Sequence, residues 1–310
     1  MLPNISNPTS HQLPAQNVSQ GIFVLIGSLL LYTIQDALIR VLPSTFTTFQ
    51  IIFFRSLFSL LPLFVLGVFE KKQTHIKGPL LKTNYIGAQV LRGVIMFVSL
   101  CFYVMACKRL PMATLYTLSY TSPLFVTLLA IPFLGERIGL YRTCGIIMGF
   151  CGVIVAMQPG TEAFQSAGFL AILSGLFTGT SIVLGKRLAL EDSNTLITLT
   201  YVLVSLFGSL IMLPSLWVEP SLFDFLILLL IGITGGIAQY GFIHAFRMAP
   251  ASTLAPFDYS GLVWAILVGY FVWGEWPSSM AHIGSALVVC GGLITLYRSK
   301  SERLQKPAVT

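Results

Sequence analysis

The sequence predicts an all-α polytopic membrane protein with ten transmembrane helices, arranged as two inverted repeats of five helices. Three observations lead to this fold class. Only 9% of the 310 residues are charged and 55% are hydrophobic, whereas about 25% of the residues of a soluble domain are charged. The apolar residues lie in long continuous stretches, and motifs of the first half recur in the second half at a constant spacing.

The apolar stretches determine the number and kind of elements. A helix needs roughly 20 mostly apolar residues to cross a bilayer. Lipid offers the backbone no hydrogen-bond partners, so continuous runs of this length favour helices over the short alternating strands of a barrel. The ten predicted spans cover residues 20–41, 45–69, 85–107, 111–134, 140–157, 168–188, 195–217, 222–246, 252–273 and 279–297.

An offset of 139 residues relates the two halves. The motif Pro111-Met-Ala-Thr-Leu corresponds to Pro250-Ala-Ser-Thr-Leu, which aligns the fourth span with the ninth and makes the repeat unit five helices long. Because five is odd, the second copy must enter the membrane from the opposite face. Gene duplication without transport is the alternative interpretation. Further pairs at the same offset are Tyr120 with Tyr259, Gly135-Glu136 with Gly274-Glu275, Gly145 with Gly284, and Gly152 with Gly291.

The repeats and the loop charges predict the organisation of the chain. Most of the 18 lysines and arginines fall in loops on one side, and only Arg40, Lys108 and Arg109 fall on the other. Cytoplasmic loops carry the basic excess, so both termini are expected in the cytoplasm and the protein in the inner membrane. The predicted segments are a disordered cytoplasmic tail at 1–19, the first repeat at 20–157, a linker at 158–167, the second repeat at 168–297 and a basic cytoplasmic tail at 298–310.

Several function classes are disfavoured. The net charge of +7 does not indicate nucleic-acid binding, because the basic residues lie between apolar runs and not on one folded face. We find no GxxxxGK[ST] motif for a nucleotide-hydrolysing pump and no constellation for an enzyme, and channels usually use other architectures. Neither a cofactor nor a metal is expected. The expected partners are the lipid bilayer, a small-molecule substrate, and either a proton or a counter-substrate. The glycine pairs read as packing within one chain, and a monomer is favoured.

Four ionisable residues inside spans are the first candidates for a site, because a charge at bilayer depth is costly and is usually functional. They are Asp36, Arg55, Arg92 and Asp258, and their charges sum to zero. Similar depths in the membrane predict that Arg92 meets Asp258 and that Asp36 meets Arg55, with Arg40 competing for Asp36. Structural ion pairs and substrate ligands remain alternative interpretations of these groups.

Polar and aromatic residues near these charges complete the candidate site. Pro256 loosens the helix beside Asp258, and the hydroxyl-rich segment Tyr116–Pro123 is its counterpart in the first half. Ordinary packing is the alternative for these residues, a structural role is the alternative for His244, and Glu136 and Glu275 are expected to make contacts at the membrane surface. The further candidates for substrate binding are Tyr116, Ser119, Tyr120, Gln239, Tyr240, His244, Tyr259 and Trp264.

The motifs of the fourth and ninth spans resemble the drug/metabolite transporter superfamily, and within it the EamA type. They are Arg109-Leu-Pro-Met-Ala-Thr-Leu with Gly135-Glu136-Arg137, and Ala249-Pro-Ala-Ser-Thr-Leu-Ala-Pro with Gly274-Glu-Trp-Pro. The resemblance implies two five-helix repeats and transport of a small organic metabolite. Members move amino acids, nucleosides, riboflavin, S-adenosylmethionine and other solutes.

The segments Phe53-Phe54-Arg55 and Leu91-Arg92-Gly93 are also similar to S-adenosylmethionine uptake carriers, although Asp258 stands where a basic residue would be expected in those carriers. The predicted function is therefore a secondary transporter that moves an amino-acid-like, zwitterionic or mixed-charge solute by alternating access. An uptake carrier for S-adenosylmethionine, or for a nucleoside or riboflavin, is the alternative.

Overall fold

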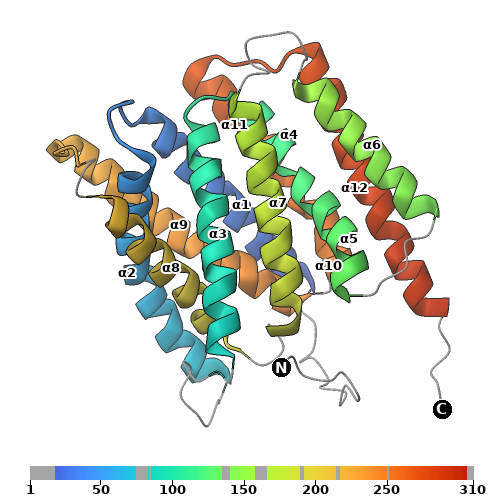
Figure 1. Ribbon diagram of the computed structural model, residues 1–310, viewed down its shortest axis with the longest axis horizontal. Helices are drawn as coiled ribbons and strands as arrows, with labels where there is room; N and C mark the ends of the chain where they lie inside the picture. The colour runs from blue at the N-terminus through green and yellow to red at the C-terminus, as the bar shows by residue number, and fades with distance from the viewer. Residues whose placement is uncertain are drawn as a thin grey trace.

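The computed structural model describes residues 18–74, 83, 85–134, 140–157, 166–188, 192–213, 217–249 and 251–305, and these form helices without strands (Figure 1). Residues 1–17 of the predicted tail, residues 158–165 of the predicted linker, and Glu136 lie outside the described residues. The helices are α1 Val18–Val41, α2 Thr48–Thr74, α3 Ile86–Cys107, α4 Met112–Ser119, α5 Thr121–Leu134, α6 Leu140–Met157, α7 Ser166–Leu188, α8 Asn194–Met212, α9 Leu222–Met248, α10 Ala251–Asp258, α11 Ser260–Trp273 and α12 Ser279–Gln305.

The membrane class and the all-α fold are confirmed. Among the described residues, seven stretches are long and apolar enough to cross a membrane, and α6 and α12 contain shorter apolar segments. Large apolar side chains also point outward, with Phe64, Leu222 and Phe271 77–78% exposed, while polar residues such as Asp36 and Arg55 are buried. Lipid would cover such an apolar outer surface.

The fourth and ninth predicted spans are not continuous helices. The chain breaks between α4 and α5 at Tyr120 and between α10 and α11 at Tyr259, which are partners at the repeat offset. Pro123 lacks the N–H that would bond the carbonyl of Ser119, the last residue of α4, and Pro256 lies inside α10. The outer limits of the spans expected at 111–134 and 252–273 agree closely with the structure, and each span contains one interruption of the helix that was not predicted.

Helix packing has a pseudo-twofold pattern. α1 packs on α9 just as α7, the first helix of the second half, packs on α3, while α2 pairs with its counterpart α8 and α6 with its counterpart α12. In Figure 1, α2, α8 and α9 lie together at one side of the bundle and α6 and α12 at the other, and the start of α1 and the end of α12 lie at the same end. This end is called the termini end below.

The contact between α6 and α12 shows that the halves are inverted. A Cβ atom on Gly152 would lie 2.7 Å from the carbonyl oxygen of Gly284, and one on Gly291 would lie 2.5 Å from the carbonyl oxygen of Gly145. These close approaches join an early residue of one helix to a late residue of the other, so the two helices run antiparallel. Gly145, Gly152, Gly284 and Gly291, which recur at the 139-residue offset, are thus points where these two helices of opposite halves touch.

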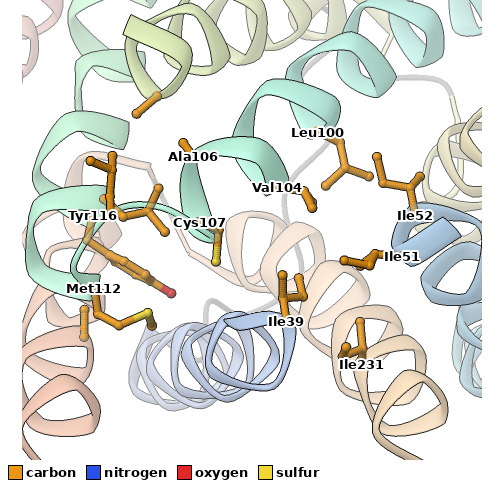
Figure 2. Packing of buried hydrophobic residues seen from close by; sticks show 14 of the residues in the cluster. Ile39, Ile51, Ile52, Leu100, Val104, Ala106, Cys107, Met112, Tyr116 and Ile231 are labelled. Atoms are coloured by element: carbon orange, nitrogen blue, oxygen red, sulfur yellow. The ribbon is translucent and has the colours of Figure 1, made fainter. Parts of the chain in front are cut away.

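The centre of the bundle is closely packed. Figure 2 shows buried residues of α1, α2, α3, α4 and α9 around one core, with the hydroxyl end of Tyr116 turned toward α1. Gly175 on α7 packs against Thr121 and Gly179 against Phe125, so this small-residue pair serves contacts within the chain, as expected. The core therefore places the polar groups of α1 and α2 beside the broken spans.

Candidate functional site

Asp36 on α1 is a buried carboxylate that is satisfied on one side only. Its side chain is 1% exposed, and Oδ2 accepts hydrogen bonds from the hydroxyls of Tyr103 at 2.7 Å and Tyr116 at 2.8 Å. The Thr33 hydroxyl, one turn earlier on α1, lies 3.0 Å from the Tyr116 hydroxyl oxygen. Oδ1 is buried without a hydrogen-bond partner. An unsatisfied oxygen of this kind is rare, because it loses its hydration without replacement.

Arg55 on α2 is 3% exposed and lies close to Asp36 without forming an ion pair with it. Its Nε donates to Oε1 of Gln35 at 3.1 Å, and Nη1 donates to the Tyr201 hydroxyl at 3.1 Å. Gly235 on α9 is required here, because a Cβ atom at this position would overlap Oε1 of Gln35. The sequence prediction that Asp36 and Arg55 are neighbours agrees with the structure, but Gln35 stands as an intermediate hydrogen-bond partner of Arg55.

Tyr32 connects the charged groups of the centre. Its hydroxyl donates to Oε1 of Gln239 at 2.6 Å, and Asp36, Arg55 and Asp258 lie near it. Sequence analysis missed Tyr32 although it precedes Asp36 by four residues and so shares its helix face, a signal that could have found it. Tyr103, Tyr201 and Gln35 were missed as well.

The two interruptions of the helices, at Tyr120 and Tyr259, lie next to each other and beside Asp258. The rings of Tyr120 and Tyr259 have centroids 4.9 Å apart, and the Tyr120 hydroxyl donates to the backbone carbonyl of Asp258 at 2.8 Å. Gly261 makes room for Tyr120, because a Cβ atom there would lie 2.8 Å from its hydroxyl oxygen. No described residue donates a hydrogen bond to the carboxylate of Asp258.

Trp264 forms a wall of this region. It packs with Phe242 of α9 against the buried cluster around Leu25, and its Nε1 is buried without an acceptor. The ring of Phe242 in turn lies edge-on to that of Tyr32, with centroids 6.3 Å apart. Ser119, by contrast, bonds the carbonyl of Leu115 in its own helix at 2.8 Å and contributes no open group.

Arg92 does not meet Asp258, and that expectation was wrong. Its Nη1 donates to Oε1 of Gln89 at 3.3 Å, and the titratable groups beside it are Tyr201 and Asp192. Depth in the membrane predicts height but not the side of the bundle: α3 packs on α7 and α8, whereas α10 packs on α1 and α12. The centre therefore holds two carboxylates, Asp36 and Asp258, but one guanidinium, that of Arg55.

A second charged cluster lies at the termini end. Glu70 of α2 is 6% exposed and accepts hydrogen bonds from the backbone N–H groups of Asn194 and Thr195, both at 3.0 Å, and from the Thr195 hydroxyl. It thus caps the start of α8, where an anion is stabilised. Nδ2 of Asn194 lies 3.3 Å from Nδ1 of His244.

Tyr240 and His244 belong to this second cluster and not to the centre. Their rings are stacked with centroids 5.9 Å apart. Arg247 donates to the backbone carbonyl of Asp192, and Nε2 of Gln89 donates to the Asp192 carboxylate. The cluster Glu70, Gln89, Arg92, Asp192, Asn194, Thr195, Tyr240, His244 and Arg247 is called the end cluster below.

Arg40 lies at the opposite end of the bundle. The expectation that it competes with Arg55 for Asp36 was wrong. Both of its Nη groups donate to the carboxylate of Glu275, and its guanidinium lies over the Trp273 ring, 4.6 Å from the centroid. Glu275 therefore makes a contact near the end of its span, as predicted.

Membrane-spanning helices in two inverted halves, with buried charged groups between the halves, are the arrangement of a membrane transporter of the inverted-repeat class. A model of the EamA-like transporter family matches residues 19–158 and 165–297. The chain belongs to this family, and its partners include a small-molecule substrate and the lipid bilayer.

Several similar proteins are named as transporters of organic metabolites. The S-adenosylmethionine uptake transporter of Rickettsia bellii is 26% identical over 294 residues, which cover 95% of this chain and 98% of the relative. The riboflavin transporter of Rhizobium johnstonii is 29% identical over 229 residues, covering 74% and 76%. A crystal structure with 18% identity and a TM-score of 0.58 covers 93% of this chain and 99% of its own, and shows the shared fold.

Proposed function

We propose that this transporter moves a mixed-charge organic metabolite of net positive charge by alternating access, without a chemical step, and that S-adenosylmethionine is the first substrate to test. We place both termini in the cytoplasm, on the loop charges, and we propose a monomer in the inner membrane. S-adenosylmethionine is the alternative substrate predicted from the sequence. A net positive charge is a narrower requirement than the zwitterionic or mixed-charge solute predicted there.

The observation that carries the proposal is the charge of the centre. Asp36 and Asp258 contribute two negative charges and Arg55 one positive charge, and none of them forms a direct ion pair with another. Arg92, which would have made the sum zero, lies in the end cluster. Uncompensated charge in a low-dielectric interior is costly, so a bound solute of net positive charge restores neutrality.

S-adenosylmethionine fits this charge and the neighbouring groups. It carries an ammonium, a sulfonium and a carboxylate, and so has a net positive charge, whereas riboflavin is uncharged. The rings of Tyr32, Phe242 and Trp264 offer apolar faces for a heterocycle, and the N–H of Trp264 has no acceptor. The Rickettsia relatives with this substrate also match over nearly the whole chain.

Alternating access is supported by the origin of the site residues. Asp36 and Arg55 come from the first half, Asp258 from the second, and Tyr120 and Tyr259 pack together where both broken spans meet. Such sites at the interface of inverted repeats are exposed to one side at a time when the halves rock. A proton or a second cationic solute would neutralise the same centre on the return step.

Uptake into proteoliposomes tests the function. We expect saturable uptake of radiolabelled S-adenosylmethionine with counterflow, strong competition by unlabelled substrate, and none by riboflavin. S-adenosylhomocysteine lacks the sulfonium charge and should compete at least tenfold more weakly, and Asp258→Asn should reduce this difference because it removes the excess negative charge. Absence of saturable uptake, equal competition by riboflavin, or unsaturable conductance would reject the proposal.

A further inference from the structure

We propose that Asp36 and Arg55 together form a subsite for an α-amino-acid group of the transported molecule, with its ammonium on Oδ1 of Asp36 and its carboxylate on the free Nη2 of Arg55. This inference deepens the proposed function and rests on it for the setting of transport. It names a chemical group that the ligand must carry, in addition to the net charge argued above.

The Asp36 carboxylate is held in place through one oxygen, while the other oxygen has no donor among the described residues. Two tyrosine hydroxyls, from Tyr103 on α3 and Tyr116 on α4, both donate to Oδ2 and so determine its orientation. Oδ1 remains buried without a donor. A native structure rarely leaves such an oxygen without a donor, so a ligand group or a water molecule is needed to supply one. An ammonium group supplies both N–H donors and the opposite charge.

Within the part of the chain that the structure describes, Arg55 likewise has hydrogen-bond partners on only two of its three guanidinium nitrogen atoms. Nε bonds Gln35 and Nη1 bonds the Tyr201 hydroxyl, so two arms of the planar group are fixed by neutral partners. Among the described residues, no acceptor is bonded to Nη2. A guanidinium in this state presents N–H groups in a fixed direction, which suits a carboxylate.

The two groups are arranged as a pair. They attract each other electrostatically without direct contact, and Gln35, the neighbour of Asp36 in the chain, lies hydrogen-bonded to Arg55. An α-amino acid carries its ammonium and carboxylate on one carbon atom, so a single end of a ligand can satisfy both protein groups.

The contact between Arg40 and Glu275 provides the contrast. There the guanidinium and carboxylate bond each other directly through two pairs of atoms, which leaves no open group for a ligand. An arginine and a carboxylate therefore bond each other directly near the end of a span, whereas at the centre they do not bond each other.

Ligands that differ in one charged group test the subsite. Purified protein in detergent is titrated with L-methionine, with N-acetyl-L-methionine, which has no ammonium, and with L-methioninamide, which has no carboxylate, and its melting temperature is followed. We expect wild-type protein to bind L-methionine at least tenfold more tightly than N-acetyl-L-methionine. It should also bind L-methionine more tightly than L-methioninamide, but by a smaller factor, because the amide carries the net positive charge that the centre favours and lacks only the carboxylate for Arg55.

The variants assign each charge to its residue. Asp36→Asn should lose the preference over N-acetyl-L-methionine and keep the preference over the amide, and Arg55→Gln should do the reverse. Arg40→Gln removes an arginine that is paired with Glu275 near the end of a span and should keep both preferences. If Arg55→Gln is not monodisperse, Arg55→Lys replaces it and should reduce the preference for the free carboxylate.

The outcomes separate this inference from the proposed function. Saturable uptake of S-adenosylmethionine together with equal binding of all three methionine compounds would overturn the subsite and leave the transport proposal intact. Binding with the expected preferences but without S-adenosylmethionine uptake would overturn the substrate and leave the subsite. Loss of both preferences in both variants alike, or no binding of L-methionine, would also overturn the subsite.

Discussion

The end cluster and the centre both bury charged residues, but they treat them differently. Glu70 in the end cluster accepts three hydrogen bonds at the start of α8. Asp36 in the centre accepts two on one oxygen and none on the other. A buried charge whose partners are all present stabilises the fold, whereas one that lacks a partner is stabilised by a ligand. Burial alone therefore does not identify a binding residue.

The two interrupted spans also differ from each other in the polar groups that surround the interruption. Their backbones break at equivalent tyrosines, yet the break in the first half lies among hydroxyl groups and the break in the second half follows Asp258. The Tyr120 hydroxyl bonds the carbonyl of Asp258, while a Cβ on Gly292 would overlap the hydroxyl of Tyr259. The scaffold is thus nearly symmetric, and the chemistry of the site is not.

The largest effect on stability is expected for Glu70→Gln. The amide keeps one acceptor but loses the charge that stabilises the start of α8, so we expect a loss of about 2–3 kcal/mol in the free energy of unfolding. Thermal unfolding of purified protein in detergent measures this loss. The preference of the folded variant for L-methionine over its analogues should be unchanged, and a changed preference would mean that the end cluster takes part in binding.

A smaller effect is expected for Arg40→Gln. The pair with Glu275 is half-buried, and its side chains are 18% and 27% exposed. Solvent screens such a pair, so its removal should cost about 1 kcal/mol or less. The same unfolding measurement checks this, with Glu275→Gln as the matched variant. A loss as large as that of Glu70→Gln would show that exposure is a poor guide to these charges.

The smallest effect on stability is expected for Asp36→Asn, although this is the same chemical change as Glu70→Gln. The amide oxygen can still accept from Tyr103 and Tyr116, and the amide nitrogen replaces the oxygen that had no donor. We expect a change of about 1 kcal/mol or less, together with loss of the ammonium preference. A destabilisation equal to that of Glu70→Gln would contradict the distinction between the two clusters.

The repeat and the polar residues of the spans could be predicted because they depend on composition along one helix. Asp36, Arg55, Tyr116 and Asp258 were recognised for this reason. Tyr32 and Tyr103 were missed, since a single tyrosine in an apolar span is common and marks no site by itself. Their importance comes from hydrogen bonds to residues far away in the chain.

The amino-acid sequence by itself determined the membrane class, the two five-helix repeats and their inverted relation, because the bilayer requires long apolar helices and an odd repeat reverses direction. Only the tertiary structure decided which charges share a neighbourhood. Position along a span gives the depth of a residue, but packing of α3 against α7 and α8 turns Arg92 toward Asp192 and away from Asp258. The rotation of each helix about its axis is set by contacts with all its neighbours, and so the net charge of the centre could not be read from any one segment.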